Sequence, residues 1–97
     1  MTSGGTPFFW ELFRKLPPEL RTAAQAAYRK FRANPAHPSL HLERLRSDPR
    51  AWSVRVTSDY RAVARRDGDD WTWVWIGDHA EFDRRFPCWS IGPRGDK

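Results

Sequence analysis

The fold is decided between Trp52 and Phe82, where the chain reads WSVRVTSDYRAVARRDGDDWTWVWIGDHAEF. Apolar and polar residues alternate over Trp52–Val56, and this period of two is typical of a strand with one buried face. Two more strands are predicted over Tyr60–Arg66 and Trp71–Ile76, joined by the turn signal DGD. The stretch therefore predicts a meander of antiparallel strands.

The residues before this stretch are spaced as in helices. After the capping pair Thr6-Pro7, apolar residues recur every three or four positions as far as Leu16. The same spacing returns between Pro18 and Phe31, and Asn34-Pro35 ends the second run. The sequence therefore predicts a helical hairpin followed by a sheet, which is an α+β fold.

Two shorter elements and the domain limits complete this prediction. Leu40–Leu45 is expected to add a short strand or extended segment, and Ala80–Phe86 a final helical turn. A chain of 97 residues has room for one domain, which we place at residues 7–86. We expect residues 1–6 to be a flexible N-terminus. Residues 87–97, rich in Pro, Gly and charge, are expected to form a flexible tail.

The chain is basic, with 17 Lys and Arg residues against 12 Asp and Glu residues, a net charge of +5 and a pI of about 10.1. This balance favours a polyanionic partner, either nucleic acid or an acidic protein. Arginine greatly outnumbers lysine, which suits phosphate binding but also arises in GC-rich genomes without any function. Charge alone therefore leaves the partner open.

The cysteine content and the N-terminus bear on the compartment. Cys88 is the only cysteine, so no disulfide forms within the chain and a reducing compartment, the cytoplasm, is expected. Met1–Phe13 has no basic leader, and Glu11 interrupts its apolar run. We therefore expect neither a signal peptide nor a membrane span.

Two arginines in the predicted strands are candidate phosphate ligands. Arg55 lies on the strand face opposite Trp52 and Val54, where it either points into solvent or lines a groove for RNA. If the hairpin register brings Arg61 beside it, two cations come within reach of one phosphate. The alternative is that these arginines are neutralised by Glu43, Asp59 or Asp78.

His79 directly follows the last predicted strand, in Gly77-Asp78-His79. Loops at strand ends commonly present functional groups, and histidine is the side chain best suited to proton transfer near neutral pH. A structural role is the alternative for a single histidine. Together with His37, His41 and Cys88 it matches no standard zinc spacing, so no metal and no other cofactor is expected.

Three tryptophans alternate along the last predicted strand, at Trp71, Trp73 and Trp75. Such a strand face is either a platform for base stacking or an aromatic surface buried under helices. We expect the second, with all three rings on one buried face.

Several reaction classes lack their characteristic motifs. The sequence has no Gly-rich phosphate loop, no Ser/His/Asp order and no paired cysteines, which argues against nucleotide hydrolysis, proteolysis and metal-dependent nuclease chemistry. RNA supplies its own nucleophile, the ribose 2′-hydroxyl. Cleavage then needs a base, cations for the developing phosphorane charge and an acid for the leaving oxygen. Arginines and one histidine meet this need.

Five motifs together are typical of one protein family. They are Leu16-Pro17-Pro18-Glu19-Leu20, Asn34-Pro35-Ala36-His37-Pro38-Ser39-Leu40, Ser53-Val54-Arg55-Val56, Tyr60-Arg61-Ala62-Val63 and Trp75-Ile76-Gly77-Asp78-His79-Ala80-Glu81-Phe82-Asp83. With these motifs and the order of its segments, the chain resembles the RelE/ParE superfamily of bacterial type II toxin–antitoxin toxins over residues 7–86. The resemblance implies a helical hairpin packed on a twisted antiparallel β-sheet. It also implies a toxin that cuts messenger RNA, commonly on the ribosome, and a cognate antitoxin that wraps around it.

The resemblance also implies roles for single residues. Arg55 and Arg61 match family arginines that bind or stabilise the scissile phosphate, and His79 matches a position of proton transfer. The segment Glu81, Phe82 and Asp83 falls where relatives carry a Tyr or Phe that positions substrate, although Phe82 cannot do acid–base work. The lysine-rich strand of the best-known members is missing. Diffuse attraction to RNA is expected from Arg44, Arg46, Arg50, Arg65, Arg84 and Arg85.

Two other functions stay open at this point. The ParE branch of the superfamily poisons DNA gyrase and is not a nuclease, and one fold serves both branches. A catalytically silent module that binds RNA or an antitoxin is the other alternative. We expect RNA cleavage, because a gyrase-binding toxin has no chemical use for a histidine beside two arginines. The expected partners are messenger RNA and an acidic, partly disordered antitoxin that buries Arg55 and Arg61.

Overall fold

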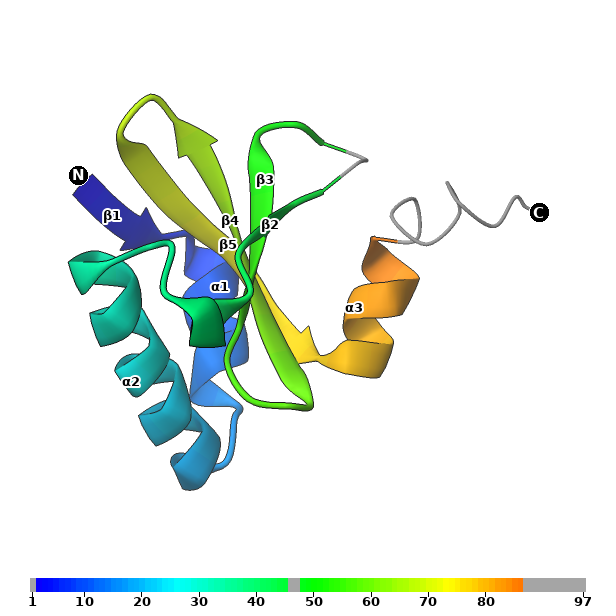
Figure 1. The fold of residues 1–97 in the computed structure, drawn as a ribbon. Helices are drawn as coiled ribbons and strands as arrows, with labels where there is room; N and C mark the ends of the chain where they lie inside the picture. The colour runs from blue at the N-terminus through cyan, green and yellow to red at the C-terminus, as the bar shows by residue number, and fades with distance from the viewer. Residues whose placement is uncertain (1, 46–47, 87–97) are drawn as a thin grey trace.

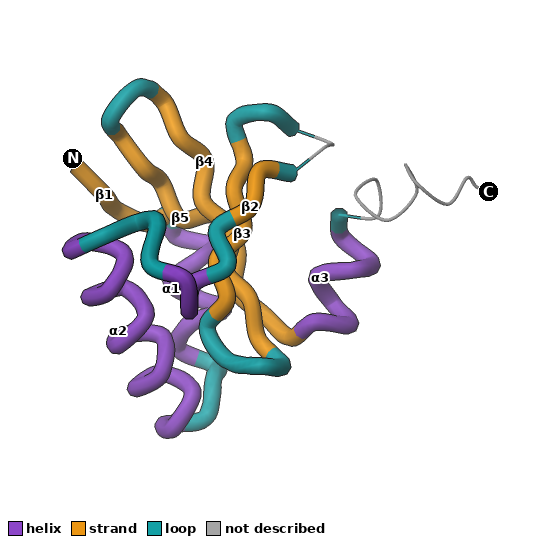
Figure 2. The backbone as a smooth tube through the Cα atoms, viewed as in Figure 1, coloured by secondary structure: helices purple, strands orange, loops and turns teal. Residues whose placement is uncertain are grey.

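Five strands form one sheet in the order β1-β5-β4-β3-β2 within residues 2–45 and 48–86, the part of the chain that the computed structural model describes. In Figures 1 and 2, helices α1 and α2 lie to the left of the central strands and α3 lies to the right. The elements are β1 (Thr2–Gly5), α1 (Pro7–Arg14), α2 (Pro18–Ala33), the 3-10 turn η1 (Pro38–Leu40), β2 (Glu43–Arg44), β3 (Ala51–Arg55), β4 (Tyr60–Asp67), β5 (Asp70–Asp78) and α3 (His79–Arg85).

The predicted helical hairpin is confirmed as α1 and α2. Thr6 caps the first helix, because its Oγ1 accepts the backbone N–H of Phe9 at 3.1 Å. Arg21 of α2 donates from Nη1 to the carbonyl of Leu16 at 2.6 Å and so ties the turn between the helices. Phe31 of α2 is fully buried, with its ring edge-to-face against Trp71 at 4.9 Å between centroids. The hairpin thus packs on the sheet through aromatic contacts.

Two apolar clusters lie on the two faces of the sheet. Cross-strand partners share a face, and the pair Ala62–Ile76 belongs to the larger cluster, which lies under α1 and α2. The neighbouring pair Val63–Trp75 belongs to a smaller cluster that includes Phe82 of α3. Alternate residues of the same strands are therefore buried on opposite sides of the sheet.

A β-bulge in β5 decides which tryptophan lies on which face. Val63 pairs with Trp75 whereas Ala64 pairs with Trp73, so Val74 has no partner in β4. Trp73 packs under the helical hairpin, and Trp75 packs against Phe82 on the other face. The expectation that all three tryptophans share one face is therefore wrong for Trp75. Residues 73–76 are all apolar, so the sequence does not indicate which face of the sheet each of these side chains occupies.

The expectation of a flexible N-terminus is wrong for residues 2–5, which form β1 in parallel pairing with β5. Gly5 pairs with Trp73, and the N–H of Thr6 donates to the carbonyl of Trp73 at 3.0 Å. These bonds come from the backbone, so β1 needs no apolar pattern of its own, and Ser3-Gly4-Gly5 shows none. The sheet is consequently mixed, with four antiparallel strands and one parallel edge strand.

The other predicted elements lie close to their expected positions. The turn between β4 and β5 contains Gly68 with a φ of 64°, a left-handed conformation that glycine adopts without steric cost. The segment Leu40–Leu45 contains the end of η1 and the two-residue strand β2, and the final helical turn is α3. Residues 87–97, expected to form a tail, lie outside the described residues.

Candidate functional site

The hairpin register brings the two candidate arginines together. Arg55 of β3 and Arg61 of β4 are direct cross-strand partners, so both side chains leave the same face of the sheet. Ser53, two residues before Arg55, and Val63, two residues after Arg61, are also partners on this face. We call this side of the sheet, which α3 partly covers, the cationic face.

Arg61 is the more firmly seated of the two arginines. Its side chain is only 15% exposed, and Nη1 donates to Ser53 Oγ at 2.9 Å. Ser53 is itself buried, and the Arg61 guanidinium lies 5.4 Å above the ring centroid of Phe82. A cation seated in this way has little conformational freedom left to lose when it binds an anion.

One acidic residue comes near Arg61. Glu43 Oε1 lies 3.9 Å from Arg61 Nη2, but the Glu43 side chain is 68% exposed, so water screens this ion pair and weakens it. Asp78 is engaged elsewhere, because its Oδ1 accepts the N–H of Glu81 at 2.7 Å as the cap of α3. Asp59 forms no ion pair with Arg61 in the described part of the chain. Arg61 thus has one screened acidic neighbour.

Arg55 points toward the end of η1. Its Nη1 lies 3.3 Å from Nε2 of His41, and within the described residues no carboxylate lies close enough to form an ion pair with it. His41 has a left-handed backbone, with φ of 46°, at the end of η1. The sequence had suggested His41 only as a zinc ligand to be rejected, and its contact with Arg55 depends on tertiary structure.

His79 begins α3 directly after the end of β5. Its backbone N–H donates to the carbonyl of Asp59 at 2.7 Å, one position beyond the Tyr60–Asp78 pair that ends the β4–β5 ladder. Nδ1 lies 3.2 Å from Asp83 Oδ2, one helical turn later, and the side chain is half-exposed. When Nδ1–H donates to this carboxylate, Nε2 is left free to exchange a proton with a ligand.

Phe82 connects His79 to Arg61. The Phe82 side chain is buried, and its ring centroid lies 6.2 Å from that of His79 and 5.4 Å from the Arg61 guanidinium carbon. The buried Phe82 ring thus packs against both polar groups.

Gly77 is a further residue of this face that the sequence reasoning left without a role. It is the cross-strand partner of Arg61, and a Cβ placed on it would lie 2.6 Å from Cζ2 of Trp75. The Trp75 ring therefore occupies the space where any other residue would carry its side chain. The absence of a side chain at Gly77 is needed for this packing beneath Arg61.

The remaining predicted residues have different surroundings. Glu81 pairs with Arg84 and, more distantly, with Arg85, while Asp83 orients His79. Arg44 lies over the ring of Trp52, which belongs to the opposite face. Arg65 pairs with Asp48 at 3.5 Å, Arg50 is exposed on the turn before β3, and Arg46 lies outside the described residues. The described members of the basic set expected to attract RNA thus lie on several different elements.

The described residues contain neither a cluster that could hold a metal ion nor a helix that could cross a membrane. No group of three or more His, Cys, Asp or Glu side chains in this part of the chain is arranged to hold a metal ion. Cys88, weighed as a zinc ligand, lies outside the described residues. Among the described helices, none is both long enough and apolar enough to cross a membrane.

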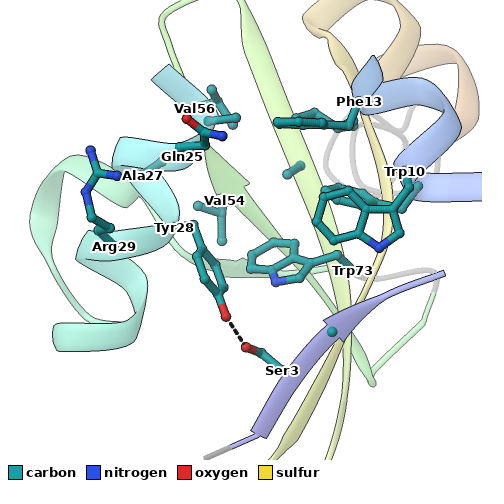
Figure 3. Close-up of a pocket in the computed structure, with 15 residues that line it drawn as sticks. Ser3, Trp10, Phe13, Gln25, Ala27, Tyr28, Arg29, Val54, Val56 and Trp73 are labelled. Atoms are coloured by element: carbon teal, nitrogen blue, oxygen red, sulfur yellow. Dashed lines mark hydrogen bonds between the residues drawn. The ribbon is translucent and has the colours of Figure 1, made fainter. Parts of the chain in front are cut away.

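A cavity of about 520 Å³ opens on the other side of the sheet, between β1, the helical hairpin and the strands (Figure 3). Phe13, Trp10, Tyr28 and Trp73 surround it, and the hydroxyl groups of Ser3 and Tyr28 are hydrogen-bonded at its edge. Its lining is mainly apolar and contains neither Arg61 nor His79. Among the described residues, Arg29 is the single charged residue of this lining, which holds no histidine to move a proton.

Comparison with known proteins supplies the family. A family model described as a ParE-like toxin domain matches residues 18–84. No curated protein sequence matches the chain. Similar solved structures include a YoeB/ParE toxin from Agrobacterium tumefaciens, with 20% identity and a TM-score of 0.65, covering 81% of this chain and 99% of that chain.

Two other solved structures share the architecture. The RelB-RelE antitoxin-toxin complex from Methanococcus jannaschii matches with 13% identity and a TM-score of 0.70, covering 86% of this chain and 98% of that chain. The isolated RelE toxin from E. coli matches with 16% identity and a TM-score of 0.63, covering 87% and 96%. Identities this low show a common fold only.

The family model spans the greater part of the chain, from the start of α2 into α3, and includes Arg55, Arg61 and His79. The order of helices and strands agrees with the resemblance stated from the sequence. The chain therefore belongs to the ParE-like toxin domain family, and it shares its fold with the YoeB/ParE and RelE structures named above.

Proposed function

We propose that this chain is the toxin of a type II toxin–antitoxin module and acts as a metal-independent endoribonuclease on messenger RNA. The observation that carries the proposal is the direct pairing of Arg55 with Arg61, with His79 at the start of α3 packed on the same Phe82 ring as Arg61. Two cations on one face provide for a phosphate and its developing charge. A histidine at the same end of the sheet provides for the proton.

The reaction that this arrangement suits is attack of the ribose 2′-oxygen on the adjacent phosphorus. The new 2′-O–P bond forms, the P–O bond to the 5′-oxygen breaks, and the products are a 2′,3′-cyclic phosphate and a 5′-hydroxyl end. Negative charge grows on the phosphate oxygens in the transition state. Arg61, fixed by Ser53 and Phe82, is already in place to stabilise that charge.

In this proposal His79 moves the proton. Its Nδ1 faces Asp83, which fixes the ring orientation and leaves Nε2 toward substrate, as a carboxylate does in other histidine-based sites. The neutral ring accepts the 2′-hydroxyl proton, or the protonated ring donates to the leaving 5′-oxygen. Asp83 acts here through His79, so it is a positioning residue.

The proposed partners follow from the same charges. One related structure is a RelB-RelE antitoxin-toxin complex, and we extend such a partner to this chain. An acidic segment of a cognate antitoxin would cover the cationic face and exclude RNA from Arg55 and Arg61. The substrate is cytoplasmic messenger RNA, including RNA on the ribosome, so the cytoplasm is the proposed site of action.

The test is induced expression of the parent and of the Arg61→Ala and His79→Ala variants, with mapping of the 5′ ends of cellular messenger RNA. The parent should arrest growth and create new ends that carry a 5′-hydroxyl. Each variant should lose about 10²–10³-fold of the cleavage rate, the usual effect of removing one transition-state donor or proton-transfer group. Arg14→Ala, which removes an exposed arginine at the end of α1, is the matched control and should cleave like the parent.

Other outcomes have distinct meanings. A soluble His79→Ala variant that cleaves as fast as the parent would contradict the assigned role of His79. Growth arrest with intact messenger RNA and stalled DNA replication would replace the ribonuclease with a gyrase poison. Absence of arrest, with RNA binding retained, would leave a catalytically silent binding module.

A further inference from the structure

A second cavity adjoins the cationic face. It has a volume of about 460 Å³ and lies between α2, η1 and the turn that joins β3 to β4. Lys30 and Arg55 line it together with the hydroxyl residues Ser39, Thr57 and Ser58. Arg55 therefore belongs both to the cationic face and to this cavity.

The two cations of the cavity have no acidic partner. In the described part of the chain, neither Lys30 nor Arg55 forms an ion pair with a carboxylate. Lys30 Nζ lies 3.4 Å from the Oγ of Ser39, and Arg55 Nη1 lies 3.3 Å from Nε2 of His41. Two positive groups at one cavity repel each other, and an anion between them relieves that repulsion.

The β3–β4 turn contributes two hydroxyl groups to the cavity, from Thr57 and Ser58. Thr57 Oγ1 accepts the backbone N–H groups of Asp59 and Tyr60, each at 3.2 Å. With its oxygen accepting twice, its own hydroxyl proton is directed away from those two groups and is available to an acceptor. Ser58, next in the turn, is exposed. Ammonium, guanidinium and hydroxyl donors together suit a tetrahedral oxyanion such as a phosphodiester.

The remaining wall of the cavity is apolar and wide enough for more than a phosphate. Ala23, Ala26 and Ala27 line it from one face of α2, and Val56 lines it from the end of β3. Small side chains on the helix leave the space open. The volume lies within the range of sites that enclose small organic ligands, about 300–1,000 Å³, so a nucleoside can lie beside its phosphate.

We propose that this cavity is a second subsite, which binds another phosphate of the same single-stranded RNA together with its nucleoside. Lys30 is the anchoring cation and Arg55 spans the two subsites. This inference rests on the proposed function, because it assumes that the cationic face binds RNA. It adds a specific contact from α2, an element that the proposed chemistry does not use.

The salt dependence of RNA binding tests this subsite. The probe is a fluorescent, mixed-sequence 2′-O-methyl RNA dodecamer, whose blocked 2′-oxygen prevents cleavage, measured by anisotropy between about 50 and 200 mM salt. Removing one phosphate contact to a single strand should flatten the plot of log affinity against log salt by about 0.7. We expect this change in Lys30→Ala, with affinity about two- to fivefold lower at the low-salt end.

Two further variants make the test specific. Lys15→Ala removes another exposed lysine, at the end of α1 and outside the cavity, and should leave slope and affinity unchanged, whereas Lys30→Arg should restore the parent slope. If the parent binds and cleaves RNA but Lys30→Ala has the parent slope, the subsite is wrong while the proposed function stands. If the parent fails to bind the dodecamer at all, both proposals are overturned. If Lys15→Ala has the same effect as Lys30→Ala, Lys30 acts only through the net charge of the protein. That result would also overturn the subsite.

Discussion

The two faces of the sheet are built from alternate residues of the same strands and have opposite chemistry. Under the helical hairpin, Val54, Ala62 and Ile76 pack with aromatic rings. On the other face, their strand neighbours include Arg55, Arg61 and buried Ser53. One face contributes apolar burial to stability, and the other places charged groups where a ligand can reach them.

The comparison shows how a small domain separates stability from function. The cationic face still contains apolar residues: Phe82 lies beneath the Arg61 guanidinium, and Trp75 packs against Phe82. A buried hydroxyl and a shielded guanidinium are costly to desolvate unless they are hydrogen-bonded. Arg61 meets that requirement through Ser53, and the same bond holds the guanidinium in position.

The largest effect on this comparison should come from the hairpin face. Phe31→Ala removes a fully buried ring from between Trp71 and Trp73 and should lower the free energy of unfolding by about 3–5 kcal/mol. Urea unfolding measures this loss. Phe8→Ala, which truncates a half-exposed ring on α1, is the matched control and should cost less than about 1 kcal/mol.

If the folded Phe31→Ala variant also cleaved RNA at a different rate, packing under the hairpin and activity on the cationic face would not be independent. RNA cleavage should therefore be measured at a temperature and concentration where circular dichroism shows the variant to be folded. We expect parent-like activity under those conditions, since Phe31 contacts none of the groups on the cationic face.

A smaller effect is expected at Gly77 on the cationic face, where the Trp75 ring leaves no room for a side chain. Gly77→Ala places a methyl group against the Trp75 ring, so the ring must shift beneath Arg61. We expect unfolding to become easier by about 1–3 kcal/mol, accompanied by slower RNA cleavage. The control is Gly4→Ala in β1, where an added Cβ meets no atom within 4 Å. Equal effects of the two substitutions on cleavage would contradict the positioning role of the Trp75 ring.

The smallest effect concerns the acidic neighbour of Arg61. Glu43→Gln keeps the shape of the side chain and removes the charge that lies 3.9 Å from Arg61. RNA affinity should rise less than about fivefold, because an exposed ion pair contributes only about 0.2–1 kcal/mol. Anisotropy with the same non-cleavable RNA measures it, with Glu19→Gln at the start of α2 as the control. A decrease in affinity would show that Glu43 orients Arg61 more than it competes with RNA.

The predictable part of the site came from strand periodicity. Alternation over Trp52–Val56 predicted Arg55 on the face opposite the apolar residues. The register of the β3–β4 hairpin brings Arg61 beside it, which the sequence had left as a possibility. The same alternation would have placed Ser53 with Arg55, although it gave no reason to single that serine out. Glu43 was weighed from the sequence as a neutralising neighbour of the arginines, but its contact with Arg61, like that of His41 with Arg55, depends on where β2 and η1 come to lie.

The sequence by itself determined the kinds of elements, their order and the strand positions of the two arginines, because helix and strand periods arise from burial of side chains only a few residues apart. Only the tertiary structure decided that β1 joins the sheet, that a bulge moves Trp75 to the cationic face, and that Phe82 supports Arg61 from below. The physical reason is that these features depend on backbone hydrogen bonds and ring contacts between segments distant in the chain. Such contacts leave no period in the local sequence, so they appear only when the strands are in register.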